Sequence, residues 1–275
     1  MGKLRLWPLI RRSYRFTFDN HDLLFHAGWP WMVVVVVCQL PSLVHPGTPG
    51  KELLSSLAMA VAGAAFATVW HRRILLDESP PGWLAVRFGR REIQYLGLGL
   101  VLSLGVIVPL VGLALLVSAL HLPGGIAAWA MIGVAFVGGA VVNRLILVFP
   151  AVAIDDKETT LRQSWHLTRG NTFRLIAGAV LSFLPLSIVS SALSIIAAKL
   201  MVAPVISTRG LGVGVESMAI IVVFYEIAIG AGFMAFTYED LIRPDGTGEH
   251  DASHRPDSTP PAELVQDDGV EGIPP

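Results

Sequence analysis

Six apolar stretches, each long enough to cross a membrane, constrain this chain more than any other feature. The hydrocarbon core of a bilayer is about 30 Å thick, and about 20 helical residues cross it. In lipid every backbone polar group must be bonded internally, so even the valine-rich first stretch has to be a helix. We therefore predict an all-α, polytopic membrane protein with six transmembrane helices. The predicted spans are 24–45, 53–76, 94–120, 125–149, 174–202 and 212–238.

Composition agrees with a membrane protein and divides the chain in two. Hydrophobic residues make up 53% and charged residues 15%, whereas soluble domains are about 25% charged. Residues 1–242 hold 18 Lys and Arg against 13 Asp and Glu, while residues 243–275 hold 2 against 8. The pattern predicts a six-helix transmembrane domain over 24–242 and an acidic, Pro-rich, disordered C-terminal tail over 243–275. The tail is interpreted as a solubilising segment or as a partner-binding one.

The distribution of Lys and Arg predicts how the chain is threaded. Residues 1–23, 72–93 and 144–174 each carry five basic residues. The turns on the other side carry only three, Lys51, Arg209 and the flanking Lys199. Because basic residues concentrate in cytoplasmic loops, we expect both termini in the cytoplasm.

The N-terminal segment 1–23 interleaves basic residues with aromatic rings. This mixture favours a short interfacial helix, which we expect to end near Asp19 and Asn20. Cationic side chains prefer anionic lipid headgroups, and aromatic rings prefer the membrane interface. The expected partner is therefore the lipid bilayer, with anionic headgroups at the cytoplasmic face. A nucleic-acid partner is not expected next to a membrane span.

The segment 144–174 predicts a helix that leaves the bilayer, a surface helix and a helix that re-enters. Within it, 157–169 is amphipathic, with Leu161 and Trp165 four residues apart. Its predicted interfacial residues are Trp165, Arg162, Arg169 and Arg174.

A weak internal echo links this segment to the preceding cytoplasmic loop. At a constant offset of 79, Asp77 and Arg90 align with Asp156 and Arg169. The echo predicts modules of one short cytoplasmic interfacial helix followed by a transmembrane hairpin. A duplication, or shared physical demands on the two loops, would account for it.

Two ionisable residues inside apolar runs are the first candidates for function, because burying a charge in a membrane is costly. Arg144 lies near the inner end of the fourth span, and Glu226 lies midway along the sixth. We hypothesise a buried Arg144–Glu226 ion pair, with Asn143 and Tyr225 nearby. In the alternative, Arg144 extends to the headgroups and Glu226 is protonated or bonded to a neighbouring helix.

A candidate polar face follows Pro185 in the fifth span. Ser187, Ser191 and Ser194 are spaced i, i+4 and i+7, which places them on one side of a helix. Such hydroxyls line a polar path, or they bond to their own helix and allow close packing.

Motifs for catalysis are not visible. The chain has no H-E-x-x-H, no phosphate-binding G-x-x-x-x-G-K-[ST] and no G-x-S-x-G, and its single cysteine, Cys38, lies in an apolar run. We therefore predict no catalytic residues, no cofactor and no metal, and interpret the protein as a non-enzyme.

The stretches R-L-I-L-V-F-P-A-V-A-I at 144–154 and L-R-Q-S-W-H-L-T-R-G-N at 161–171 carry a resemblance. The chain resembles bacterial six-span inner-membrane proteins of unknown function, similar to YciC-like proteins and to the membrane domain of glycerophosphoryl diester phosphodiesterases. The resemblance implies a six-helix fold and a bacterial inner-membrane location. It does not imply the diesterase activity, whose catalytic barrel needs about 250 soluble residues.

These observations predict an accessory or structural role in envelope or membrane homeostasis. One alternative is a small transporter or channel that uses Arg144 and Glu226. The other is a membrane-embedded lipid-modifying enzyme.

Overall fold

The computed structural model describes residues 4–44, 50–79, 88–202 and 206–242. Within these ranges the chain forms helices and no strand, so the all-α prediction is confirmed. The helices are α1 (Leu6–Asp19), α2 (His21–Val44), α3 (Lys51–Leu76), α4 (Arg90–Ala119), α5 (Gly124–Arg144), α6 (Val148–Ala153), α7 (Leu161–Leu167), α8 (Thr172–Val202) and α9 (Ile206–Ile242).

Six of these helices, α2, α3, α4, α5, α8 and α9, are long and apolar enough to cross a membrane. The chain is thus a multi-pass membrane protein, as the six apolar stretches predicted. The first, second, third and fifth predicted spans agree with α2, α3, α4 and α8 to within a few residues. The predicted tail, 243–275, lies outside the described residues, and its disorder stays a prediction.

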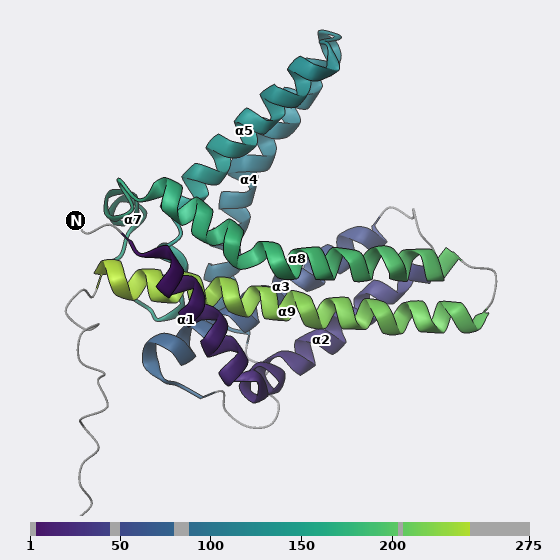
Figure 1. The fold of residues 1–275 in the computed structure, drawn as a ribbon, viewed down its shortest axis with the longest axis horizontal. Helices are drawn as coiled ribbons and strands as arrows, with labels where there is room; N and C mark the ends of the chain where they lie inside the picture. The colour runs from purple at the N-terminus through teal and green to yellow at the C-terminus, as the bar shows by residue number, and fades with distance from the viewer. Residues whose placement is uncertain (1–3, 45–49, 80–87, 203–205, 243–275) are drawn as a thin grey trace, which may run out of the picture.

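The six long helices form three hairpins (Figure 1). The α2–α3 and α8–α9 hairpins run side by side, with α9 in contact with both α2 and α3. The α4–α5 hairpin projects away from them at a steep angle (Figure 1). At the end opposite the hairpin turns lies a packed region that we call the hub, which comprises α1, α6, α7 and the helix ends packed against them.

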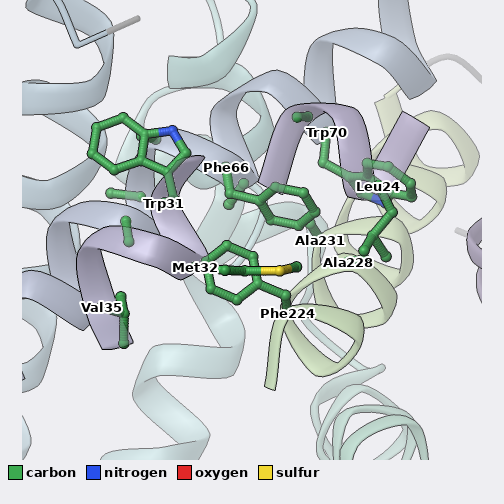
Figure 2. Close-up of a cluster of buried hydrophobic side chains, with 14 of the residues drawn as sticks. Leu24, Trp31, Met32, Val35, Phe66, Trp70, Phe224, Ala228 and Ala231 are labelled. Carbon is green, nitrogen blue, oxygen red and sulfur yellow. The ribbon is translucent and has the colours of Figure 1, made fainter. Parts of the chain in front are cut away.

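The buried side chains are concentrated in the hub and next to it. The largest cluster joins α2, α3 and α9 and contains Trp31, Phe66, Trp70 and Phe224 (Figure 2). A second cluster joins α1, α8 and α9, and a third packs α6 onto α9 around Tyr238. By contrast, α5 has no buried residue, and α4 has only Glu92 and Tyr95 in its first two turns. The α4–α5 hairpin therefore presents apolar side chains outward along most of its length.

Helix α9 is longer than its predicted span, 212–238. Its 37 residues correspond to about 55 Å, far more than the thickness of the hydrocarbon core. Its fully buried residues, among them Phe224, Phe233 and Tyr238, lie in its second half. That half of α9 is therefore the part against which α1, α2, α3 and α6 pack.

Helix α1 lies across the α8–α9 pair, and it ends at Asp19, with Asn20 as its C-cap, as predicted. Its buried face includes Leu9, Ile10 and Ser13. The Ser13 hydroxyl donates to the carbonyl of Ile229 at 2.5 Å. A Cβ at Gly232 would lie 2.6 Å from the Ser13 Oγ, so the glycine is what lets the two helices approach so closely.

The predicted fourth span, 125–149, was wrong at its inner end. Helix α5 stops at Arg144, the chain turns over Leu145–Leu147, and α6 follows. The turn buries Ile146 and Leu147 in the third cluster. Pro150 lies in the first turn of α6, where a missing backbone N–H costs little. The apolar run that reads as one span is therefore a span plus a short helix packed in the hub.

A matched pair of glycine variants in α9 tests this packing. A Cβ at Gly230 would lie 2.2 Å from the ring of Phe183, whereas a Cβ at Gly214 would meet nothing within 4 Å. Gly230→Ala should lower the free energy of unfolding by about 1–3 kcal/mol because it overpacks the helix contact. Gly214→Ala should leave it unchanged or raise it slightly. Unfolding of detergent-solubilised protein measures both, and equal stabilities would contradict the described α8–α9 contact.

Candidate functional site

The polar residues singled out by the sequence fall into two separate places, one at the base of α5 and one between α8 and α9. Arg144 is the last residue of α5, and its Nη2 donates to the backbone carbonyl of Trp165 at 3.0 Å. Its guanidinium carbon lies 3.7 Å from the centroid of the Trp165 ring. A cation over an indole ring is stabilising by about 0.5–2 kcal/mol. The contact fastens α7 to the end of α5.

The backbone of Arg144 strengthens the same junction. Its carbonyl is freed by the end of the helix, and it accepts from the hydroxyls of Ser164 at 2.8 Å and Thr168 at 3.1 Å. Both hydroxyl groups belong to buried residues of the α7 segment. The sequence analysis missed them because a Ser or Thr in a short amphipathic helix carries no sign of its partner.

Glu226 lies in α9 and faces α8. Its two carboxylate oxygens accept from the hydroxyls of Ser187 at 3.1 Å and Ser190 at 2.6 Å. The predicted ion pair is therefore not formed, because Arg144 and Glu226 each bind other groups. The splayed α4–α5 hairpin carries Arg144 towards α7 and away from α9.

The other two members of the predicted pair site are also apart. Asn143 donates from its side chain to the carbonyl of Gly139 at 2.9 Å, within its own helix. Tyr225 stacks on Phe18 of α1, with ring centroids 5.6 Å apart, and meets Phe25 of α2 edge-on. Neither residue connects Arg144 to Glu226.

The predicted serine face is correct for Ser187 and wrong for Ser191. Ser191 is exposed and Ser194 is half-buried, whereas Ser190, which the sequence analysis did not single out, is buried. Spacings of three and four residues both keep side chains on one helix face. Only the direction in which α8 meets α9 selects Ser190 over Ser191. The one signal in the sequence was Glu226, an acid in the sixth span that needs hydrogen-bond donors from a neighbouring helix.

Helix α1 covers the Glu226 cluster. The Tyr14 hydroxyl donates to the carbonyl of Ser182 at 2.8 Å. Burial raises the pKa of Tyr14, and the nearby charge of Glu226 raises it further. The cluster is thus a carboxylate with two hydroxyl donors, closed on one side by an amphipathic helix.

The predicted interfacial arginines take different places. Arg162 and Arg169 are exposed on the α7 segment, and Trp165 is 37% exposed. Arg174 instead reaches the N-terminal segment and donates to the carbonyl of Leu4 at 3.2 Å. The side-chain oxygen of Asn171 accepts from the backbone N–H of Leu4 at 3.2 Å. These two contacts hold the start of α1 against the start of α8.

A polar network joins the loop that follows α3 to the loop that follows α6. Arg72 donates to Glu78 at 2.8 Å and to the carbonyl of Ala153 at 2.9 Å. Arg91 pairs with Asp155. The four charged residues of this network line a cavity of about 530 Å³. The cavity contains both signs of charge, so it is not an anion site by charge alone.

The internal echo has a partial counterpart in the backbone. Asp77 and Asp155 both have left-handed conformations, with φ of 54° and 58°. Asp77 directly follows α3, and Asp155 follows α6 after one intervening residue, Ile154. The sequence alignment pairs Asp77 with Asp156, so the two loops correspond with a shift of one residue. The surface helix expected before α4 falls largely in 80–87, outside the described residues. The duplication stays a prediction.

Asp156 connects the loop between α6 and α7 to the C-terminal half of α9. It accepts from the hydroxyl of Thr159 at 2.6 Å, from the backbone N–H of Glu158 at 2.8 Å and from the hydroxyl of Tyr238. Burial raises the pKa of Asp156, but these hydrogen bonds outweigh burial and hold the pKa below its usual value.

In the part of the chain that the structure describes, no group of three His, Cys, Asp or Glu side chains could hold a metal ion. Comparison with protein-family models, with curated proteins and with solved structures finds no match. The resemblance to six-span inner-membrane proteins therefore stays a prediction.

A double-mutant cycle distinguishes the observed partner of Arg144 from the predicted one. Arg144→Gln combined with Trp165→Leu should show a coupling energy of about 0.5–2 kcal/mol in the free energy of unfolding. Arg144→Gln combined with Glu226→Gln should be additive to within about 0.5 kcal/mol, because the two residues share no partner. A larger coupling for the second pair would restore the Arg144–Glu226 hypothesis.

The pH dependence of stability tests Asp156. Its pKa is lower in the folded than in the unfolded state, so its stabilising effect is present above the unfolded pKa of about 3.9. The effect is lost as the pH falls through the lower, folded pKa. Thermal melts between about pH 5 and pH 3 should therefore fall less steeply for Asp156→Asn than for wild type.

Tyr238→Phe removes one of the three donors to Asp156 and should give an intermediate slope. Tyr225→Phe, which changes a tyrosine with no contact to Asp156, serves as the control. If Asp156→Asn follows the wild-type curve, the hydrogen bonds do not shift its titration.

Proposed function

We propose that this protein is a non-catalytic accessory protein of the bacterial inner membrane, with a structural role in envelope or membrane homeostasis. The observation that carries the proposal is the division of the molecule into a packed hub and outward-facing apolar hairpins. The α4 and α5 spans have none of their residues buried in their most apolar windows, whereas 61% of the α9 window is buried. Such a molecule is suited to anchoring a packed unit on a membrane.

The proposed orientation places the hub on the cytoplasmic leaflet. Arg72, Arg91 and Arg144 belong to the hub loops or their borders, as do the basic residues of α1 and α7. The positive-inside rule then puts both termini in the cytoplasm. Lys199 and Arg209 lie at the opposite, turn end of the α8–α9 hairpin.

The dimensions of α5 support this placement. Its 21 residues, Gly124–Arg144, correspond to about 30 Å, the thickness of the hydrocarbon core. Arg144 would then lie at the inner headgroups. Trp129 lies near the turn end and is 75% exposed, as expected for an aromatic ring at the outer interface.

The exposed face of α1 would meet the inner headgroups. Arg5, Arg11 and Arg15 are exposed on it, together with Trp7. Its opposite face is buried on α8 and α9. A cationic face with an aromatic ring is suited to anionic lipid, and each basic residue contributes about 1 kcal/mol near such a surface.

A small transporter or channel is the second candidate, and the Glu226 cluster is the observation that favours it. A carboxylate with hydroxyl donors from Ser187 and Ser190, in a spanning helix, is the kind of group that binds protons or cations. Neither the polar cavity of the hub nor the apolar groove between α4 and α5 is lined by Glu226. The accessory role is therefore the better supported of the two.

Complementation of a deletion strain tests the proposal. Arg5→Glu with Arg11→Glu should fail to restore dye exclusion and the lipid profile, because the reversed charges repel anionic headgroups. Lys199→Glu, a charge reversal at the turn end, should restore both and serves as the matched control.

Glu226→Gln decides between the two candidates in the same strain. It should complement like wild type, because the accessory role needs no titrating group at that position. A Glu226→Gln variant that folds and inserts but behaves like the deletion would favour transport and contradict the accessory role.

A further inference from the structure

An open apolar groove runs between α4 and α5. It encloses about 680 Å³, within the usual range for small-molecule sites. No charged side chain lines it, and its walls are formed mostly by valines and glycines of the two helices. Leu161, at the start of α7, lines it as well, so the groove reaches the hub. The residues that line it include Gly105, Val106, Gly133, Val137, Gly138, Leu145 and Leu161.

The groove exists because side chains are missing from its walls. A Cβ at Gly105 or at Gly133 would meet nothing within 4 Å. At Gly138, by contrast, a Cβ would lie 2.9 Å from Val106, so the helices touch there. Two helices in contact at one level and opened by glycines at others leave a slot between them.

The medium around the slot determines what can fill it. The α4–α5 hairpin projects away from the rest of the bundle (Figure 1), and its side chains are exposed along both helices. In a membrane that surrounding is lipid, so an acyl chain is the molecule present at the slot in greatest amount. An apolar slot of this shape matches an acyl chain and offers nothing to a polar ligand.

Two arginines are sequence neighbours of residues that line the hub end of the groove. Arg162 follows the lining residue Leu161 and is exposed. Arg144 precedes Leu145, another lining residue, and its guanidinium is held on Trp165. An apolar slot that ends beside two arginines is complementary to a molecule with an anionic head and an apolar tail.

We propose that the α4–α5 groove holds one acyl chain of an anionic phospholipid, with the phosphate of the lipid bound at Arg162 and Arg144. The inference deepens the proposed function, on which it rests for the position of the hub at the headgroups. It names the lipid class that the protein would engage and the hairpin that engages it. The α4–α5 hairpin is then the part of the protein that binds the lipid.

Photocrosslinking of purified protein in phosphatidylcholine nanodiscs tests the groove. The probe is phosphatidylglycerol with a diazirine in one acyl chain, and labelled peptides are identified by mass spectrometry. Wild type should be labelled in α4 and α5. Gly105→Leu with Gly133→Leu adds bulk at two lining positions where a Cβ meets nothing within 4 Å, and should reduce that labelling by about tenfold.

Two other glycines provide matched controls on the same helices. Gly112 of α4 and Gly139 of α5 also have open space at the Cβ position, but neither lines the groove. Gly112→Leu with Gly139→Leu should label like wild type. Equal labelling of the filled-groove and control variants, each with a wild-type melting temperature, would overturn the proposal.

Two further arms examine the head of the lipid and a rival occupant. A phosphatidylcholine probe should label the groove less than phosphatidylglycerol, and Arg162→Gln should remove the difference. Equal labelling of the wild type by both probes would overturn the anionic assignment.

Val137→Cys in a Cys38→Ser background should stay monomeric, and an intermolecular disulfide would show a second copy in the groove instead. These readouts use purified protein, so they are independent of the complementation result.

Discussion

A helix surrounded by lipid gains nothing from hiding apolar side chains, and this constraint governs where the protein packs. Helix association inside a bilayer depends on close van der Waals contact and hydrogen bonds, since the hydrophobic effect is absent there. The close contact between the spans α8 and α9 at Gly230 agrees with this. The cluster around Tyr238, in contrast, packs the turn after α5 and α6 against the end of α9 in the hub, which the proposed orientation places at the inner headgroups. The largest cluster joins the spans α2, α3 and α9 and includes Trp31, Phe66 and Phe224. The α4–α5 hairpin has a close contact of this kind between its own helices, at Gly138 and Val106, and projects away from the other two hairpins (Figure 1).

The cost of a charge in lipid explains the second main feature, the end of α5. A guanidinium is expensive in the hydrocarbon core, and Arg144 is the last residue of α5, which the proposed orientation places at the inner headgroups. Its side chain then finds the Trp165 ring, while its carbonyl finds the hydroxyls of Ser164 and Thr168. The residues after it remain apolar because they are buried in the hub as α6. One arginine thus joins the end of a span to α7.

The sequence was sufficient for the number, type and approximate bounds of the spans, because hydrophobic length is a local property. It was insufficient wherever the outcome depended on the direction of packing. The turn at Leu145–Leu147 contains no glycine or proline, so the run 125–149 reads as one helix. The choice of Ser190 over Ser191 follows from how α8 meets α9. The sequence suggested similar depths for Arg144 and Glu226, but each residue has other partners, Trp165 for the arginine and two serines of α8 for the glutamate. Distance along a helix axis says nothing about distance across the bundle.

The most direct test of the account is the accessibility of single cysteines on the two sides of the membrane, in a Cys38→Ser background. Leu122→Cys lies in the turn between α4 and α5, Ile132→Cys lies on the exposed face of α5, and Glu158→Cys lies in the hub. A membrane-impermeant maleimide should label the first in intact cells, the third only after permeabilisation, and the second in neither case. Labelling of Glu158→Cys in intact cells, or of Ile132→Cys from either side, would contradict a cytoplasmic hub anchored by hairpins in lipid.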